Sequence, residues 1–213
     1  MPYPAGHRER VREKIVDSAR RLFNLNGFDG VSVDAIMAEA GLTRGAFYSY
    51  FNGKSELYAE VLGCFFTDPH FQSRWEGVEV DLASPGAGRQ IVRAYLSRQH
   101  FENVEDSCPM VALPGDVARS DVRVRKAFEG VFRGMVSVLT REMNGTSGRR
   151  EETAMAIAAL CVGGMVVARS VGDGEFADRL REAATRVALD LGGWKRRAVR
   201  KRQGRPARAS AAG

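Results

Sequence analysis

The stretch that most constrains the fold of this chain is VSVDAIMAEAGLTRGAFYSYFNGKSELY, residues 31–58. In its first part, apolar residues recur at the i, i+3, i+4, i+7 spacing of an amphipathic helix. They are Val33, Ile36, Met37 and Ala40. Gly41 can take the left-handed conformation with which helices commonly end, and Thr43 offers a hydroxyl to cap a following helix. The stretch therefore predicts two short helices joined by a tight turn.

The second of these helices, predicted from Thr43 to Phe51, has an inward and an outward side. Ala46, Phe47 and Phe51 are expected to face the first helix. The outward side then carries Arg44, Gly45, Tyr48 and Ser49. An arginine can make a bidentate contact with a guanine edge, and a tyrosine or threonine hydroxyl can bond a phosphate. The pattern indicates a DNA-reading helix-turn-helix, and an ordinary helical hairpin is the alternative.

These residues also resemble a known family. The run GAFYSYFNGKSELY, residues 45–58, with VDAIMAEAGLTR before it, resembles the DNA-binding domain of TetR-family transcriptional regulators over roughly residues 10–60. The motif positions are Gly41, Gly45, Tyr48, Phe51, Lys54 and Leu57. Met37 departs from the family, which usually has alanine there, and a larger side chain could open the angle between the two helices.

The resemblance implies a fold, a domain organisation and a set of partners. The implied fold class is all-α, with an N-terminal three-helix helix-turn-helix domain and a larger helical ligand-binding and dimerisation domain. The implied boundaries are residues 1–53 for an arm and the DNA-binding domain, 54–194 for the helical domain and 195–213 for a basic tail. The implied partners are a double-stranded DNA operator, a second copy of the chain and a small-molecule inducer, with no cofactor and no membrane.

The predicted DNA contacts come from the helix-turn-helix and its flanks. They are Ser32, Thr43, Arg44, Gly45, Tyr48, Ser49 and Lys54. Ser32 is expected to cap the helix that follows it, Arg44 to read a base, and Thr43 and Tyr48 to hold phosphates. Lys54 stands at the start of a fourth predicted helix, where the helix dipole adds partial positive charge. A phosphate clamp is therefore expected there, with a solvated surface lysine as the alternative.

A basic segment precedes the first predicted helix, which runs from Arg8 to Asn26 and ends at Gly27. The basic residues of this segment are His7, Arg8, Arg10 and Arg12. An arm of this kind can lie along a phosphate backbone or in the minor groove. A frayed, solvated terminus is the alternative.

The remaining sequence predicts a helical domain. Helices are expected over residues 54–66, 87–103, 121–143, 151–171 and 176–194, with another beginning near Pro109. Residues 67–88 read as a connecting loop with a short helix over residues 71–75. The last two helices are apolar on more than one face and therefore need a further partner, and the Gly163–Gly164 pair allows close backbone approach. A two-fold dimer would place two DNA-reading heads ~34–36 Å apart over a palindromic operator.

The positive charge of the chain lies in its last residues. Residues 195–213 hold eight of the 32 Lys and Arg residues and no acid, which leaves 24 basic against 26 acidic residues in residues 1–194, a net charge of −2. The basic pI is therefore no argument for DNA binding by the rest of the chain. The tail is expected to be disordered and either to add salt-sensitive affinity for DNA or to aid solubility only.

Nothing in the sequence indicates catalysis. The three histidines, His7, His70 and His100, lie in different segments without metal-ligand spacing. The sequence contains no phosphate-binding loop after a strand and no HExxH or GxSxG motif. A chain without an enzymatic site is therefore expected.

Cysteine usage and hydropathy predict a cytoplasmic protein. Cys64, Cys108 and Cys161 lie far apart, which indicates a reducing compartment without a disulfide framework or zinc site. The first residues lack a secretory pattern, and the longest apolar segment, residues 154–168, is expected to be too short to span a membrane and to form a buried helix.

An inducer is expected in a mostly apolar cavity of the helical domain. The residues expected to line it are Tyr95, Phe101, Cys108, Phe128, Phe132 and Met165. Cys108 precedes Pro109 at a predicted helix start, where the dipole lowers the pKa of a thiol. The resulting hypothesis is a ligand-released repressor. Its alternatives are an activator, a helical dimer without operator binding, and a sensor of electrophiles or oxidants through Cys108, which is otherwise a small buried core residue.

Overall fold

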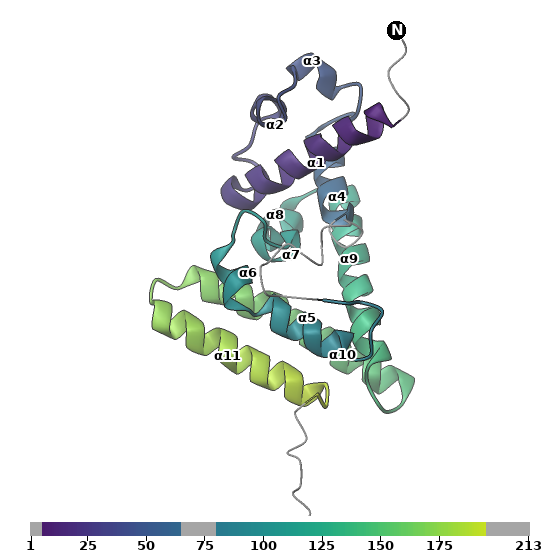
Figure 1. Ribbon diagram of the computed structural model, residues 1–213, viewed down its shortest axis with the longest axis vertical. Helices are drawn as coiled ribbons and strands as arrows, with labels where there is room; N and C mark the ends of the chain where they lie inside the picture. The colour runs from purple at the N-terminus through teal and green to yellow at the C-terminus, as the bar shows by residue number, and fades with distance from the viewer. Residues whose placement is uncertain (1–5, 65–79, 195–213) are drawn as a thin grey trace, which may run out of the picture.

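The computed structural model describes residues 6–64 and 80–194, and these residues form eleven α-helices and no strand. The helices are α1 (His7–Asn26), α2 (Val33–Glu39), α3 (Arg44–Phe47), α4 (Lys54–Cys64), α5 (Ala87–Tyr95), α6 (Arg98–Glu102), α7 (Pro109–Ala112), α8 (Pro114–Arg119), α9 (Val122–Arg141), α10 (Ser147–Ser170) and α11 (Gly174–Leu191). The predicted all-α class is confirmed. The helices α1, α2 and α3 lie at one end of an elongated molecule, and α5, α10 and α11 lie at the other (Figure 1).

The turn between α2 and α3 is built as the sequence predicts. Gly41 has a φ of +64°. Its N–H bonds the carbonyl of Ala38 at 2.9 Å, and the N–H of Leu42 bonds the carbonyl of Met37 at 2.8 Å. These two bonds form a Schellman motif, which satisfies the last carbonyls of α2. At the other end, the Ser32 hydroxyl accepts a hydrogen bond from the N–H of Ala35 at 3.1 Å, which confirms Ser32 as the cap.

The helix after this turn is shorter than predicted. It ends at Phe47, and the N–H groups of Tyr50 and Phe51 both bond the Phe47 carbonyl, at 2.9 and 3.0 Å. The chain thus closes into turns that bring Phe51 into the core, where it is 1% exposed. Thr43 occupies the cap position, but its side chain makes no capping hydrogen bond.

The helix α4 joins the two ends of the molecule (Figure 1). Its apolar side chains pack into the same core as α1, α2 and α3, which we call the head core. The members from α4 are Leu57, Tyr58, Val61 and Leu62, and those from later in the chain are Leu113, between α7 and α8, Val117 of α8 and Val124 of α9. The Tyr58 ring stacks on Phe28 with centroids 4.7 Å apart. Because the head core runs through α4, the predicted boundary after residue 53 falls within a continuous core.

The helical domain departs from the predicted pattern at one break. The single helix expected over residues 87–103 is divided into α5 and α6, because Ser97 is extended and its hydroxyl accepts a hydrogen bond from the N–H of His100 at 3.1 Å. A serine competes with the helix in this way by bonding backbone nearby. The predicted linker before residue 151 is also shorter, since α10 begins at Ser147.

The helix α10 is the central element of the helical domain and packs against α9 and α11. A Cβ on Gly164 would lie 2.9 Å from the Cβ of Ala184, so the close approach of α10 and α11 requires glycine there, whereas a Cβ on Gly163 would meet nothing within 4 Å. By length and composition alone α10 could cross a membrane, because the helix, Ser147–Ser170, is longer than the apolar segment at residues 154–168. Its residues Ala154, Ile157, Cys161 and Met165 are instead fully buried in the domain core.

Several predictions lie outside the described residues. They concern the short helix at residues 71–75, the connecting loop up to residue 79, the end of the fourth helix at residues 65–66, the residues before Gly6 and the basic tail.

A buried arginine fixes α1 to the turn after α6. Arg20 is 4% exposed, and its guanidinium donates hydrogen bonds to Asp17 at 2.7 Å, to Asp106 at 2.9 Å and to the Glu105 carbonyl at 3.2 Å. Replacing Arg20→Met should lower the free energy of unfolding by about 2 kcal/mol, because two carboxylates and a carbonyl lose a charged donor. Urea denaturation measures this change.

The matched control is Arg98→Ala, which removes an arginine that is paired with Glu102 at 2.7 Å but has a 70% exposed side chain. An exposed pair contributes about 0–1 kcal/mol. Equal losses in the two variants would contradict a structural role for Arg20.

Candidate nucleic-acid interface

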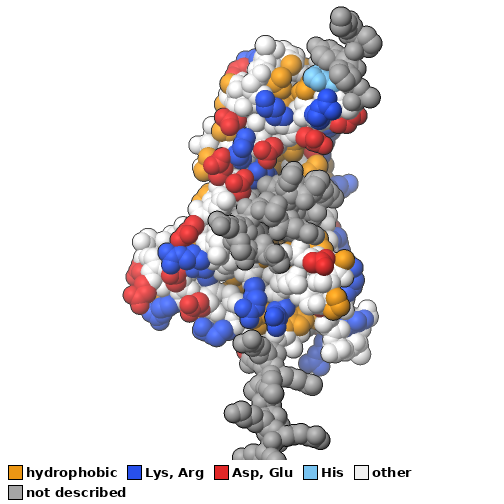
Figure 2. Space-filling view, in the orientation of Figure 1, with side chains coloured by type: hydrophobic (Ala, Val, Ile, Leu, Met, Phe, Trp, Pro, Cys, Tyr) orange, Lys and Arg blue, Asp and Glu red, His pale blue; other side chains and the backbone are white. Residues whose placement is uncertain are grey.

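The outward side of α3 lies in solvent, as the sequence predicts. Arg44, Gly45, Tyr48 and Ser49 are exposed, and Phe47 is fully buried. Tyr48 is 62% exposed, yet its ring stands edge-on against Phe47 with centroids 5.3 Å apart. The packing of the ring therefore restrains the side chain while its polar end remains accessible. Over the visible face of this end of the molecule, Lys and Arg side chains alternate with acidic ones (Figure 2).

Gly45 leaves an open place on this surface. A Cβ built on Gly45 would meet nothing within 4 Å, and its φ is not positive. Among residues 6–64 and 80–194, neither packing nor backbone conformation therefore requires glycine here. Because glycine lowers helix stability by roughly 0.5–1 kcal/mol relative to alanine, an external surface that approaches the backbone closely would account for it.

Arg44 is held by an acidic residue of the neighbouring helix. Its Nη1 donates to Oδ2 of Asp34, on α2, at 2.8 Å, and the two side chains are 63% and 57% exposed. The predicted base-reading arginine is thus exposed and oriented at once. This pair was not predicted from the sequence, although Asp34 lies in the first turn of α2 and that helix was predicted.

Lys54 faces the protein, which the sequence did not predict. Its Nζ donates to the carbonyls of Phe28 at 2.8 Å and Val31 at 2.9 Å, and lies 4.2 Å from the centroid of the Phe28 ring. The ammonium therefore ties the loop between α1 and α2 to the start of α4. One of its three N–H groups is left for another acceptor, so a phosphate contact by Lys54 stays a prediction.

The predicted basic arm begins as the first turns of α1. Arg8 donates to the Ser49 carbonyl at 2.9 Å, and Arg12 donates to the Tyr50 carbonyl at 2.6 Å and to Glu60 at 2.8 Å. The hydrogen bond with Glu60 raises the pKa of the Arg12 guanidinium. These contacts hold the start of α1 against the segment that follows α3. A groove of about 460 Å³ lies between α1 and α3 beside them.

Of the residues predicted to line an inducer cavity, Phe132 lines a groove between α9 and α10, and the other five lie in or against the core of the helical domain. Tyr95, Cys108 and Met165 lie in the core of the helical domain, at 4%, 0% and 0% exposure. The rings of Phe128 and Phe132 stack with centroids 6.3 Å apart. Phe101 lies under the guanidinium of Arg181, 4.8 Å from the ring centroid. Phe101, Phe128 and Phe132 are only partly buried and pack against that core. Periodicity thus identified positions that face the interior but could not tell a filled core from a cavity wall.

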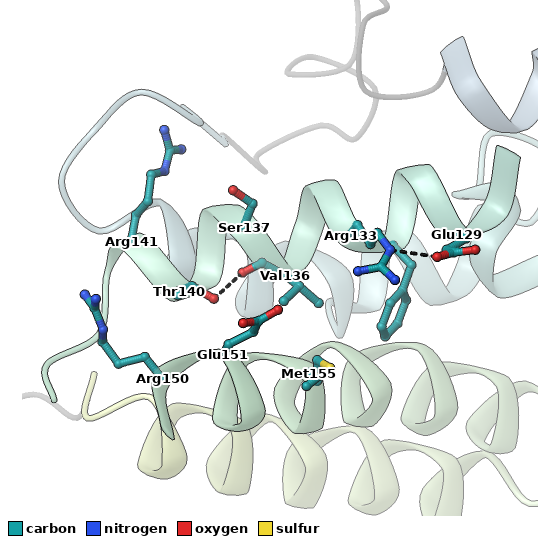
Figure 3. Close-up of a pocket in the computed structure, with 10 residues that line it drawn as sticks. Glu129, Arg133, Val136, Ser137, Thr140, Arg141, Arg150, Glu151 and Met155 are labelled. Atoms are coloured by element: carbon teal, nitrogen blue, oxygen red, sulfur yellow. Dashed lines mark hydrogen bonds and ion pairs between the residues drawn. The ribbon is translucent and has the colours of Figure 1, made fainter. Parts of the chain in front are cut away.

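Two grooves in the helical domain are open to a ligand. The first, about 430 Å³, lies between α4, α5 and α9 and is mostly apolar. Its lining is Gly63, Leu82, Ile91, Lys126, Ala127, Gly130, Val131, Gly134, Met135 and Val138. The second, about 470 Å³, lies between α9 and α10 and includes the predicted residue Phe132. In this second groove Arg133 turns toward Glu129, and Glu151 and Met155 rise from α10 toward α9 (Figure 3).

A series of hydrogen-bonded, buried polar groups lies beside Cys108. Arg169 donates to the Ser107 hydroxyl at 2.8 Å, and that hydroxyl lies 2.8 Å from Nε2 of His100. Nδ1 of His100 lies 2.7 Å from the Tyr95 carbonyl, which can only accept, so Nδ1 carries the proton and Nε2 accepts. The Cys108 N–H also points at Nε2, at 3.3 Å.

The turn that contains Ser107 also contacts the head. Asn24, on α1, donates through Nδ2 to the Ser107 carbonyl at 2.9 Å and to the Glu105 carbonyl at 3.0 Å. The backbone of Ser107 therefore bonds α1, while its hydroxyl bonds α6 and α10. This bridge was not visible from the sequence, because its partners lie far apart along the chain.

The three cysteines differ in accessibility. Cys108 is fully buried, and the Tyr95 hydroxyl donates to its Sγ at 3.2 Å, which fits the alternative of a small core residue. Cys161 is buried as well, and burial raises the pKa of its thiol to about 12. Cys64 is exposed at the end of α4.

Comparisons with known proteins place the head in a family. Residues 15–61 match the family described as bacterial regulatory proteins, tetR family. The HTH-type transcriptional regulator SrpR of Pseudomonas putida is 36% identical over 86 residues, which cover 37% of this chain and 40% of SrpR. The matched stretch thus spans less than two thirds of that relative.

Two further similarities extend over most of the chain. The HTH-type transcriptional regulator LmrA of Bacillus subtilis is 26% identical over 162 residues, covering 73% of this chain and 85% of LmrA. The crystal structure of the reduced form of Escherichia coli NemR superposes with a TM-score of 0.65 at 18% identity, covering 85% of this chain and 96% of NemR. At that identity the likeness shows the fold.

The buried histidine predicts a pH dependence of stability. Burial, with a smaller contribution from Arg169, lowers the pKa of His100 from 6.5 to about 3. Between these values the unfolded chain binds a proton at His100 that the folded chain does not, so the folded state is favoured above pH 6.5 and loses stability as the pH falls toward 3. The loss should approach about 1.4 kcal/mol per pH unit in this window.

Urea denaturation of the wild type and of His100→Gln, at pH 7.5, 6.0 and 5.0, measures this slope. The variant should retain the part of the pH dependence that comes from the carboxylates and lose the part that comes from His100. Identical slopes for the two proteins would contradict a neutral, buried His100.

Proposed function

Because this chain belongs to the TetR family of bacterial regulatory proteins, we propose that it is a homodimeric transcriptional repressor that is released from a palindromic operator by a small molecule. The observation that carries the proposal is the outward side of α3. It presents an exposed Arg44, an exposed Tyr48 and a Gly45 whose missing side chain no packing requires. Arginine suits guanine edges, tyrosine suits phosphates, and glycine permits close approach to a backbone.

Exposed apolar faces on the last two helices support a dimer. On α10, apolar residues four apart lie in solvent, and α11 carries a matching row. The α10 row is Met155, Ala159, Gly163 and Val167, and the most exposed members of the α11 row are Phe176, Val187 and Leu191. Contiguous apolar surface of this kind marks a protein interface. We assign it to a second copy of the chain, since a two-fold axis pairs each face with itself.

The apolar groove between α4, α5 and α9 is the better candidate for the inducer. The groove between α9 and α10 is lined by three arginines and two glutamates, whereas the first groove contains a single charged side chain, Lys126. Gly130 and Gly134 lie one turn apart on α9, and a Cβ on either would meet nothing within 4 Å. Both glycines weaken the helix without a packing reason among the described residues, so the space they leave suits an apolar ligand with an anionic group near Lys126.

Two connections would carry occupancy of this groove to the head. The helix α4 contributes Gly63 to the groove at one end and Lys54 to the loop of the head at the other. The turn at Ser107 bonds α1 on one side and α10 on the other. A ligand that favours one position of α4 would shift the dimer toward a spacing of the two heads that no longer matches the operator. The size of this shift depends on how much more tightly the ligand binds one conformation than the other.

Three alternatives are kept. An activator would have the same contacts with DNA. A helical dimer without operator binding would leave the surface of α3 unused. A sensor acting through Cys108 would first have to expose a thiol that is fully buried, so ligand release is favoured.

Selection of DNA by the purified full chain tests the proposal. Random duplexes should yield a palindrome whose half-sites are centred about one helical turn apart. Arg44→Ala should reduce discrimination at one base pair by about 1–3 kcal/mol, because a bidentate contact is lost, while Tyr48→Phe should weaken all sequences alike. Fluorescence anisotropy at fixed salt measures both effects.

Gly45→Ala separates binding from folding. It should leave the melting temperature equal or higher, because the added methyl group meets no atom within 4 Å and alanine favours a helix, yet it should weaken operator binding. Enrichment of no sequence by the wild type would refute the proposed function.

Binding of 1-anilinonaphthalene-8-sulfonate, an apolar anion, tests the groove. The dye should bind the wild type, and Gly134→Leu should weaken its binding at least about fivefold, since a leucine side chain fills space worth about 1–3 kcal/mol of apolar contact. Dye titration by fluorescence, with and without operator, gives the affinity and the release of DNA.

The control is Gly148→Leu, in the first turn of α10, where a Cβ also meets nothing within 4 Å and where the residue lines neither of the two grooves. Equal dye affinity for the two variants would place the dye elsewhere.

A further inference from the structure

The contact between Arg44 and Asp34 has a consequence for how the head chooses its DNA. It joins the outward side of α3 to the first turn of α2, with 2.8 Å between Nη1 and Oδ2. Both side chains are more than half exposed. A pair this exposed adds only about 0–1 kcal/mol to stability, and the start of α2 is already capped by Ser32. The fold therefore has little need of the Asp34 carboxylate.

The carboxylate has a larger effect on what Arg44 can do. A guanidinium carries five N–H donors in a rigid planar fork, and Asp34 engages one of its two terminal nitrogens. The other donors remain for an acceptor pair such as O6 and N7 of guanine. Holding the side chain in one orientation before binding also reduces the conformational entropy lost when it meets a base.

We propose that Asp34 is a specificity-determining residue of the head, which holds Arg44 toward a base edge and disfavours complexes in which Arg44 turns to a phosphate. In the first arrangement the carboxylate stays paired. In the second, Arg44 leaves Asp34, and an unpaired carboxylate remains beside the polyanionic backbone, which is unfavourable. Asp34 therefore lowers affinity for non-operator DNA and raises the ratio of operator to non-operator affinity. This inference rests on the proposed function.

The other acid exposed on α2 provides a control. Glu39 lies 3.6 Å from Arg21 of α1, so its carboxylate is engaged away from α3. Asp34→Asn and Glu39→Gln each remove one negative charge from the same helix with little change in shape. A general electrostatic effect would be the same in both variants, whereas an effect through Arg44 would appear only in Asp34→Asn.

The experiment measures the affinities of the full chain for its selected operator and for a scrambled duplex at one salt concentration. The variants are Asp34→Asn, Glu39→Gln, Arg44→Ala and the double variant Asp34→Asn with Arg44→Ala. Asp34→Asn should bind scrambled DNA more tightly and lower the affinity ratio by about tenfold, the scale of one base contact. Glu39→Gln should leave the ratio unchanged. The double variant should have the same ratio as Arg44→Ala, because Asp34 acts through Arg44.

Two results would overturn the inference. The first is an unchanged ratio in Asp34→Asn. The second is a further fall of the ratio when Asp34→Asn is added to Arg44→Ala, since Asp34 would then contact a base itself, for example a cytosine amino group. Failure of the proposed function is distinct from both, because the wild type would then select no operator.

Discussion

The burial of α4 in the head core is the constraint on which the rest of the structure depends. Leu57, Tyr58, Val61 and Leu62 are each at most 1% exposed, and burying a side chain of this size contributes about 1.5–3 kcal/mol. The same core takes in Val124 of α9, so the head cannot separate from the helical domain without exposing apolar surface. The helix that presents Lys54 to the head and Gly63 to the apolar groove is therefore anchored at both ends.

Apolar packing holds the two parts together, and the polar turn at residues 103–107 fixes how they meet. Apolar contacts have little directional preference, whereas a buried polar group must find a partner with defined geometry. Ser107 satisfies this condition on two sides, toward Asn24 of α1 and toward His100 and Arg169 of the helical domain. Small displacements in either part thus change hydrogen bonds in the other, which suits the proposed regulator, whose output would be the spacing of two heads.

Prediction from the sequence succeeded where the signal was local. The long helices α1 and α9 have a sustained apolar period, and Gly27 and Gly41 mark helix ends by their backbone conformations. It failed at Ser97, where a hydroxyl that bonds a nearby N–H divides a continuous apolar period. It also extended α3 too far, because the burial of Phe51 is reached through turns and not through further helix.

The sequence alone determined the two short helices around Gly41, the outward placement of Arg44 and Tyr48, and the apolar faces of the last helices, since each depends on residues within one or two turns of each other. Only the tertiary structure decided that Lys54 bonds the carbonyls of Phe28 and Val31, that Cys108 is buried and that Tyr95 and Met165, expected in a cavity wall, lie in a core. These outcomes depend on partners distant in the chain. Which partner a side chain finds, and whether the space beside it is filled, is settled when separate helices pack together.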